Sequence, residues 1–247
     1  MMGSDTREGT RMTIRRVLWG IAAFVALIAI SCALFFLSKS RSFQTFGKMV
    51  ARIETDKKRI ALTIDDGPTL RNAEILSTLK ELDIPATFFL CGSSMAERPE
   101  DLKAIASAGH QIGNHSYSHR RMVLVSYDFC KREIEDTTRL IREAGYAGTV
   151  YFRPSNFKRL FVLPWYLKNE GITTVLCDVE PETFLGSGAP AQELADLLIG
   201  QVKPSSIILM HAMFGDNSLE AIRLAIPQLK AQGYEFVTVD ELIEGSV

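Results

Sequence analysis

The sequence predicts an α/β domain built from parallel βα units and preceded by one transmembrane helix. Residues 17–37 form a run of 21 residues without a charge, and an α-helix needs ~20 apolar residues to cross a bilayer. Downstream, strand-like segments alternate with helical ones, which is typical of parallel βα units. The strands include apolar runs such as TFFL (87–90) and IILM (207–210), which suit strands buried on both faces.

The charge-free run divides the N-terminal part of the chain into a basic segment at 1–16, the expected membrane anchor at 17–37 and a membrane-proximal linker at 38–58. A cleaved signal peptide is the alternative, because Ser38 and Ser40 form a small-x-small pair. The run is longer than the usual ~7–15-residue apolar region of a signal peptide, which favours an uncleaved anchor. Basic residues flank both ends of the run, so the positive-inside rule gives little help with orientation. We expect a single-pass membrane protein whose catalytic domain is extracytoplasmic, in the periplasm or at the cell surface.

The composition argues against a nucleic-acid partner. The 247 residues carry a formal net charge of −1 and 23% charged residues, so nothing favours binding to nucleic acid or to a broad anionic surface. The cysteines form neither a zinc-ribbon pattern nor an even disulfide framework: Cys32, Cys91, Cys130 and Cys177. We infer no obligate protein partner.

The elements follow one another in a regular order after a small strand within 49–55. The main strands are expected at 59–65, 86–91, 110–115, 149–153, 172–178, 205–211 and 234–240. Helices are expected at 69–82, 98–109, 126–144, 160–170, 191–202 and 218–232. Several helix ends carry recognisable signals, which are Thr69 and Ser126 as N-caps, Pro99 in a first turn, and Gly109 and Gly145 after a last turn.

The alternation alone fits both an open doubly wound sheet and a closed barrel. Ionisable residues distinguish the two, because they lie at or just past the carboxyl ends of five different strands: Asp65, Asp66, His115, Arg153, Asp178 and His211. In barrel enzymes the loops after the strands converge on that rim and carry the active site. The sequence therefore favours a closed or nearly closed barrel.

Two histidines and a carboxylate indicate a metal site at this rim. The HSYSH stretch spaces His115 and His119 by four, so in a helical turn both rings project from one face. Such a pair alone is more often part of a solvated surface. With a carboxylate at a neighbouring strand end, two imidazoles and one carboxylate form a facial triad that leaves positions open for water and substrate.

The adjacent carboxylates of Asp65 and Asp66 indicate a division of labour, because two like charges in close quarters raise each other's pKa unless a cation intervenes. One Asp would ligate the metal, and the other would accept a proton from a water held by it. Gly67 and Pro68 would form a tight turn that lets both side chains address the rim. A plain β-turn is the alternative.

Hydrolysis of an amide also needs an acid for the departing amine, and His211 at a separate strand end is the candidate. A hydrogen-bonded core histidine is the alternative. Arg153, at the end of YFR, would pair with a rim carboxylate and orient the base. A surface salt bridge is the alternative for Arg153.

Four motifs resemble, in order, those of the polysaccharide deacetylases, the NodB-homology family of carbohydrate esterases (family 4): LTIDDGP, HSYSH, FRPSNF and IILMH. The likeness covers residues 59–240 of a catalytic domain expected at 59–247. It implies a distorted (β/α)7 barrel and metal-dependent removal of N-acetyl groups from the amino sugars of a glycan such as peptidoglycan, a chitin-like chain or an exopolysaccharide, with release of acetate. The implied cofactor is a divalent metal ion, most often zinc, with cobalt, nickel or manganese as alternatives.

The resemblance also implies a role for each matching residue. Asp65 is the implied general base and His211 the general acid, and Arg153 would orient Asp65. The implied metal ligands are Asp66, His115 and His119. Leu209 would line the pocket for the acyl methyl group, and a backbone N–H near Asn156 would bind the oxyanion. Assigning base and ligand within the Asp pair rests on this resemblance.

The chain departs from the family's pattern in two places. The third motif reads SNF after Arg-Pro, where the family often has Pro-Tyr-Gly. Between FRPSNF and IILMH, the EPETF stretch offers Glu180 and Phe184 where the family usually has Asp and Trp. Glu180 would accept a hydrogen bond from Arg153 or influence His211, a role that Asp178 could share. Phe184 would give the substrate site a flatter and less polar wall than tryptophan. We expect altered substrate preference rather than inactivity.

Other functions also fit the sequence. The same barrel could remove formyl or acetyl groups from a lipid-linked sugar, which the anchor makes credible. A non-catalytic envelope protein would bind a glycan and release no acetate. A facial-triad iron oxygenase shares the two-His, one-carboxylate site, but the second Asp has no role in it.

Overall fold

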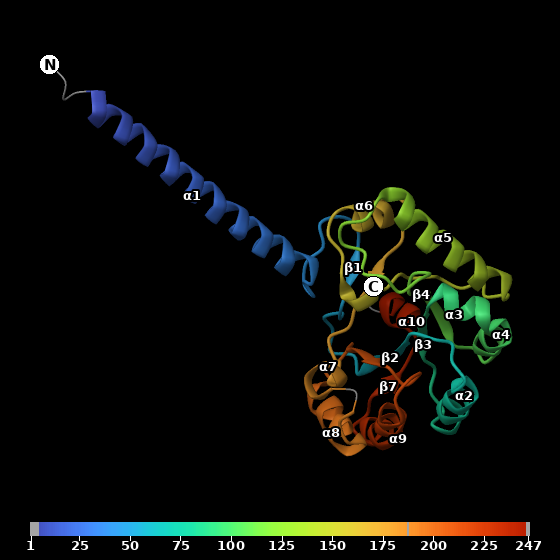
Figure 1. The fold of residues 1–247 in the computed structure, drawn as a ribbon. Coiled ribbons are helices and arrows are strands. Elements are labelled where there is room, and N and C mark those ends of the chain that lie inside the picture. The colour runs from blue at the N-terminus through green and yellow to red at the C-terminus, as the bar shows by residue number, and fades with distance from the viewer. Residues whose placement is uncertain (1–4, 187, 246–247) are drawn as a thin grey trace. The chain divides into compact units, whose positions relative to one another are not determined.

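The computed structural model describes residues 5–186 and 188–245 (Figure 1), and the chain divides into two units between Ser40 and Arg41. The first unit consists of helix α1 (Asp5–Ser38). Its stretch Arg15–Ser38 is long and apolar enough to cross a membrane, with a mean hydropathy of 2.7 and exposed side chains. This property fits a membrane anchor, and a signal sequence near an N-terminus shares it.

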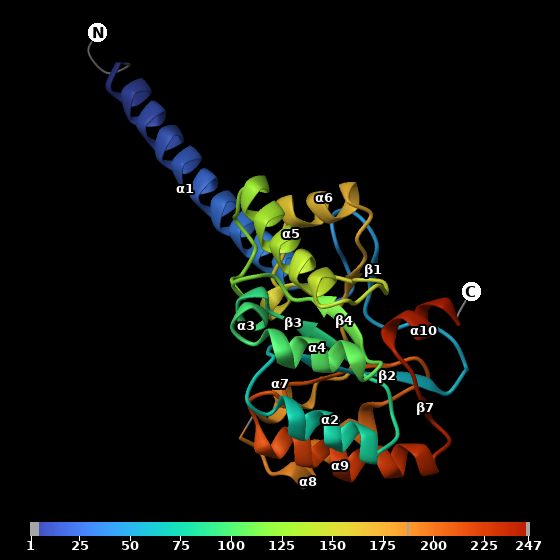
Figure 2. The same cartoon turned by 90° about the vertical axis from the view of Figure 1, so that its right-hand side faces the viewer.

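The second unit alternates strands with helices. Its strands are β1 (Met49–Val50), β2 (Arg59–Asp65), β3 (Thr87–Leu90), β4 (Gln111–Asn114), β5 (Thr174–Val175), β6 (Ile207–Met210) and β7 (Glu235–Phe236). Its helices are α2 (Asn72–Glu81), α3 (Gly92–Glu97), α4 (Pro99–Ser107), α5 (Tyr127–Glu143), α6 (Val162–Asn169), α7 (Pro181–Leu185), α8 (Ala191–Gln201), α9 (Asp216–Ala231) and α10 (Val239–Glu244), with a 3₁₀ turn η1 (Ser155–Phe157). Figures 1 and 2 show α2, α8 and α9 on one side of the strands and α5 and α6 on the other.

Every pairing between two strands is parallel, which confirms the expected parallel α/β fold. Strand β2 lies between β3 and β6, and β4 follows β3. Isolated parallel bridges then join β4 to Phe152, Phe152 to Thr174, and Val179 to Ile208 of β6. The pairings thus make a circuit back to β6, although several links are single bridges. β7 pairs with the amino end of β2.

Strand β2 shows how alternating side chains build both the core and the site. Every second side chain, from Ile60 to Ile64, is fully buried in the larger hydrophobic cluster together with residues of α2 and α9. The intervening side chains of Ala61, Thr63 and Asp65 point to the opposite face, where Ala61 belongs to a second cluster. Asp65 is therefore the last residue of the inward-facing row, at the carboxyl end of the strand.

Some expected element ends are confirmed and others are wrong. Ser126 caps α5 by accepting a hydrogen bond from the Phe129 N–H, and Pro99 opens α4, as predicted. The Thr69 cap is wrong, because α2 begins only at Asn72 and the Thr69 hydroxyl donates to the carbonyl of Met213 instead.

The expected strands at 149–153 and 234–240 are largely wrong. The first contributes only the bridges at Phe152. The second pairs only at 235–236, because Thr238 caps α10 with a capping box that turns the following residues into a helix. Helices α3 and α7 were not predicted; both are shorter than seven residues, too short to show a helical period.

Residues just after Ser40 belong to the second unit, although they lie in the expected linker. Strand β1 pairs with β5, and the Thr45 hydroxyl donates to the carbonyl of Leu160. The buried Arg159 donates to the side chain of Gln44 at 2.9 Å. This segment is therefore attached to the loop that carries η1.

Candidate active site

The turn after β2 brings both aspartates to one side of the sheet. In a regular strand Asp65 and Asp66 would point to opposite faces. Asp66 has a φ of 69° and Gly67 a φ of 77°, so the chain leaves strand geometry at this point. Asp tolerates this left-handed region better than most residues. Both carboxylates consequently reach Nε2 of His115, at 3.7 Å for Asp65 and 3.6 Å for Asp66.

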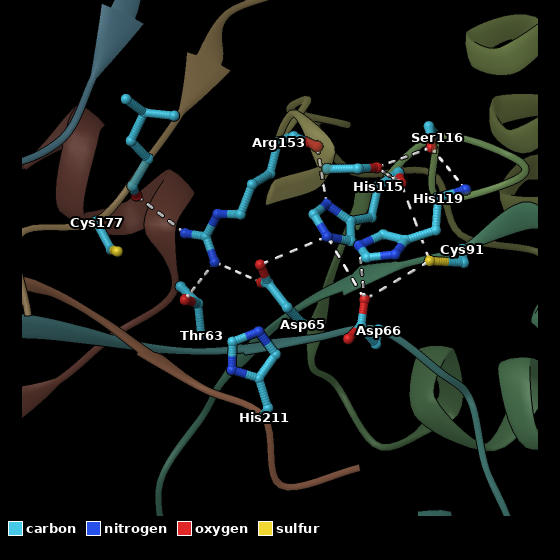
Figure 3. A network of polar contacts seen from close by, with 12 residues as sticks. Thr63, Asp65, Asp66, Cys91, His115, Ser116, His119, Arg153, Cys177 and His211 are labelled. Atoms are coloured by element: carbon cyan, nitrogen blue, oxygen red, sulfur yellow. Dashed lines mark hydrogen bonds and ion pairs between the residues drawn. The ribbon is translucent and has the colours of Figure 1, made fainter. Parts of the chain in front are cut away.

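The three expected metal ligands come together in one cluster. Asp66, His115 and His119 each offer a ligand atom, and these atoms lie within 4.8 Å of one another. Nδ1 of His115 donates to the backbone carbonyl of Arg153 at 2.8 Å, which directs the Nε2 lone pair toward the carboxylates (Figure 3). Burial lowers the pKa of His115, so this ring is neutral, as a metal ligand must be. This donor set fits a divalent ion such as zinc.

The loop that carries the two histidines is not helical, contrary to the expected helical turn. Ser116 and His119 both have positive φ values, 66° and 55°. The buried carboxylate of Glu133, on α5, accepts from the backbone N–H groups of Tyr117 and Ser118. A helix supplies its own N–H partners, whereas this loop relies on a side chain from another element. Glu133 was missed, although a carboxylate on the apolar face of an amphipathic helix is a usable signal.

The expected contact between Arg153 and Asp65 is present. Arg153 is fully buried, and its Nη1 donates to Oδ1 of Asp65 at 2.5 Å and to the Thr63 hydroxyl at 2.7 Å. Its other donors reach the carbonyls of Val175 and Leu176. A guanidinium held this way fixes the orientation of the carboxylate and supplies a permanent positive charge beside it.

His211 lies on another side of Asp65, with its ring turned toward that carboxylate (Figure 3). Its Nδ1 contacts Glu182 at 2.5 Å, and Glu182 also accepts from the His211 backbone N–H and from the Ser218 hydroxyl. Burial lowers the pKa of His211, but the hydrogen bond to Glu182 and the charges of Glu182, Asp65 and Asp66 outweigh it and raise the pKa to about 9. His211 is therefore protonated at neutral pH, as a proton donor must be.

Glu180 does not occupy the place that the sequence suggested. Its carboxylate pairs with Arg41 at 2.6 Å, and within the described residues it bonds neither Arg153 nor His211. Asp178 accepts from the Ser206 hydroxyl and a backbone N–H instead. The reason is local: α7 begins at Pro181, which leaves Glu180 at the N-cap and turns Glu182 inward. Pro at the first helical position was the signal that could have distinguished the two glutamates.

A cavity of about 310 Å³ joins these groups. Asp65, His115, His119, His211 and Asn156 line it. Among the described residues that line it, neither Phe184 nor Leu209 appears. Phe184 is 69% exposed on the outside of α7, and Leu209 is fully buried in the second hydrophobic cluster.

Cys91 lies next to the metal cluster without belonging to it. Its Sγ is 3.9 Å from Oδ1 of Asp66. Burial and the neighbouring carboxylates raise the pKa of this thiol, so it stays protonated. Cys91 is not among the described residues whose ligand atoms cluster, which leaves the ligand set at one carboxylate and two imidazoles.

With this geometry in place, comparison with known proteins identifies the class. The sequence profile of the polysaccharide deacetylases matches residues 52–175, and the chain belongs to this family. It is 35% identical to a peptidoglycan-N-acetylglucosamine deacetylase of Bacillus cereus, over 77% of this chain and 70% of that protein. It is 32% identical to the peptidoglycan-N-acetylmuramic acid deacetylase PdaC of Bacillus subtilis, over 78% of this chain and 40% of the relative.

Solved structures of the same family are similar in fold. A peptidoglycan N-acetylglucosamine deacetylase in complex with 4-naphthalen-1-yl-N-oxidanyl-benzamide superposes with a TM-score of 0.73 at 31% identity, over 78% of this chain and 92% of that one. A family pseudoenzyme from Bacillus anthracis superposes with a TM-score of 0.71 at 27% identity, over 78% and 68% of the two chains. Similarity of fold therefore does not by itself decide activity, and the side chains of the site must.

Proposed function

We propose that this protein removes N-acetyl groups from the amino sugars of an envelope polysaccharide, with peptidoglycan as the first candidate, and releases acetate. One observation carries the proposal: a carboxylate fixed by a buried arginine lies in the same cavity as the two histidines of an Asp-His-His cluster and a protonated histidine. Each part matches a requirement of amide hydrolysis, namely a base, a site for a Lewis acid, and an acid for the leaving amine.

Asp65 is the general base in this proposal. Arg153 occupies Oδ1, which leaves Oδ2 facing His115 and the cluster. That oxygen is free to accept a proton from an attacking water. His211 acts from the other side, where Glu182 holds Nδ1 and leaves Nε2–H to donate to the departing nitrogen.

Asp66, His115 and His119 would hold the metal, with zinc first and cobalt, nickel or manganese as alternatives. A divalent cation in this site supplies Lewis acidity, which activates water and polarises an acyl carbonyl. The backbone N–H near Asn156 would donate to the developing oxyanion. We retain Leu209 as a candidate neighbour of the acyl methyl group, because β6 places it two residues before His211.

The N-terminal helix would act as an uncleaved anchor that holds the catalytic domain on the outer side of the membrane. Its length and hydropathy support this part of the proposal, and the named relatives act on peptidoglycan. Fractionation of cells with an antibody to the catalytic domain tests it. We expect the domain in the membrane fraction. Recovery of a soluble fragment that begins after Ser40 would instead show that the helix is a cleaved leader.

The activity is tested with the full chain purified in detergent. Acetate release is measured on N-acetylglucosamine oligomers, peptidoglycan and a lipid-linked N-acetyl sugar, after chelation and again after metal is restored. We expect release from polymeric glycan that chelation abolishes and metal restores. Metal binding without acetate release from any substrate would instead identify a glycan-binding protein, and release from the lipid-linked sugar alone would change the substrate class.

A further inference from the structure

A residue that no role above uses lies in the wall of the catalytic cavity. Arg41 lines this cavity together with Phe157, Glu180 and Thr183. It precedes residues 52–175, the region that the family's sequence profile matches. It is also the first residue of the second unit, so its contacts with the catalytic domain lie within that unit. A segment outside the matched region therefore contributes a side chain to the cavity.

Three contacts hold the guanidinium of Arg41 in place. Its Cζ lies 3.6 Å from the centre of the Phe157 ring, and its Nη2 donates to Oε2 of Glu180 at 2.6 Å. Its Nη1 donates to Sγ of Cys177 at 3.6 Å. The side chain nevertheless remains 41% exposed. A long exposed side chain normally keeps much rotamer entropy, so one that is already ordered loses less when a ligand binds to it.

Phe157 is placed against Arg41 at a cost in backbone free energy. Its φ is 54°, in the left-handed region, where a residue with a Cβ is strained. It is the last residue of SNF, where the family often has glycine, which adopts this conformation without strain. Its ring is buried and stacks against the guanidinium of Arg41. Strained residues cluster at functional sites, so the ring and the arginine that it supports point to a role in binding.

The contacts of Arg41 separate it from the reacting groups. Within the described residues, Arg41 forms no hydrogen bond or ion pair with Asp65 or His211. The Phe157 ring that it covers lies 6.0 Å from the guanidinium of Arg153, which in turn holds Asp65. Arg41 thus acts on a different part of a bound ligand from the amide that Asp65 and His211 serve.

Glu180 decides what kind of group Arg41 can bind. Its carboxylate offsets the positive charge of Arg41, so the pair has no net charge. The two side chains offer N–H donors and acceptor oxygens next to one another. A hydroxyl group both donates and accepts a hydrogen bond, so it can bond to both side chains, whereas an anion is repelled by the carboxylate. The pair therefore suits the neutral hydroxyl groups of a sugar.

We propose that Arg41, held by Phe157 and Glu180, binds the hydroxyl groups of a neutral sugar unit adjacent to the one that is deacetylated. Arg41 is thereby a substrate-binding residue that makes the enzyme prefer an oligomeric glycan to a monosaccharide. This inference rests on the proposed deacetylase function and narrows its substrate to a chain of at least two sugar units.

The test measures binding separately from turnover. The full chain with Asp65→Asn and metal bound is titrated in detergent with the linear tetramer of N-acetylglucosamine, and the affinity of the monosaccharide is measured by competition. Arg41→Met, added to Asp65→Asn, keeps an unbranched apolar stem and removes the donors. We expect it to weaken tetramer binding about 10-fold, the size of one hydrogen bond to a charged group, and to leave the monosaccharide unchanged. Arg41→Lys keeps the charge beside Glu180 but not the planar fork, so its loss should be intermediate.

Arg52→Met is the matched control, because Arg52 lies in the same N-terminal segment of the second unit, pairs with Asp178 at 3.8 Å and is not among the described residues that line the cavity. It should leave both affinities unchanged. Tetramer binding that Arg41→Met does not weaken overturns the inference. An equal loss of tetramer and monosaccharide affinity also overturns it, because such a loss shows a merely structural role.

Acetate release by the wild-type chain distinguishes this inference from the function on which it rests. Release from the tetramer, with tetramer binding that Arg41→Met leaves unchanged, preserves the deacetylase function and removes the subsite. Tetramer binding that depends on Arg41, without acetate release from any glycan, supports the subsite and counts against the function.

Discussion

The two sides of the catalytic cavity use the same residue type in opposite protonation states. On the metal side, His115 is buried and its pKa is lowered by burial. On the other side, His211 is also largely enclosed, but its pKa is raised to about 9, because Glu182 receives its Nδ1–H. The partner of Nδ1 makes the difference: a neutral carbonyl for His115 and a carboxylate for His211. One ring is thereby prepared to bind a cation and the other to donate a proton.

The two sides also differ in how they are held. The metal side depends on left-handed backbone at Asp66 and His119 and on the fully buried Arg153. The His211 side depends on one carboxylate from a helix of five residues and on the hydroxyl of Ser218. We therefore expect loss of a metal ligand to abolish activity, and loss of His211 to slow hydrolysis to an extent set by the leaving group.

The largest effect on activity should come from substituting each of the two aspartates in turn. Asp66→Ala removes a ligand and should lose the metal, whereas Asp65→Asn should keep the metal and lose turnover by about 10²–10⁴-fold, the range for a missing general base. Metal content by elemental analysis, together with acetate release, distinguishes the two. Equal loss of metal from both variants would contradict the division of labour.

Removing the acid should leave the metal in place and slow hydrolysis by an amount that depends on the substrate. His211→Ala should slow amide hydrolysis by about 10²–10⁴-fold and an activated aryl acetate far less, because an aryl oxide leaves without protonation. The measurement is kcat/KM on an N-acetyl oligosaccharide and on the aryl ester. Similar losses on both would remove His211 from the acid role.

The smallest effect should be a shift in pH dependence. His211 works while protonated, so its raised pKa keeps the enzyme active up to about pH 9 and activity falls as the pH rises through that value. Glu182→Gln removes the main group that raises this pKa, so the alkaline limb of the kcat/KM profile should move to lower pH. Glu180→Gln is the control, since Glu180 pairs with Arg41 and not with His211. An alkaline limb in the same place for Glu182→Gln and wild type would show that another group sets it.

Much of the site could be predicted because its residues are close in sequence or carry unmistakable chemistry. Asp65 and Asp66 are adjacent, and His115 and His119 are four apart, so short motifs record them. Arg153 could be paired with a rim carboxylate because both were expected at the carboxyl ends of parallel strands. The sequence pointed to Glu180 where the structure has Glu182 beside His211. The prediction treated EPETF as a motif and did not consider that a helix begins at Pro181.

The contacts that could not be predicted join residues far apart in sequence. Glu133 is contacted by Tyr117 and Ser118, and Glu182 is contacted by Ser218. Each depends on the register of one element against another, which composition and periodicity do not encode. Phe184, expected as a wall residue, is exposed on α7 and is not among the described residues that line the cavity.

The sequence by itself determined the order of strands and helices, the charge-free N-terminal helix and the identity of the groups at the strand ends, because these depend on local periodicity and on residue chemistry. Only the tertiary structure decided which glutamate holds His211, how the histidine loop is supported and which cations face the cavity. Those outcomes depend on distances between separate elements, and a carboxylate or a cation acts on a neighbour only across a few ångströms.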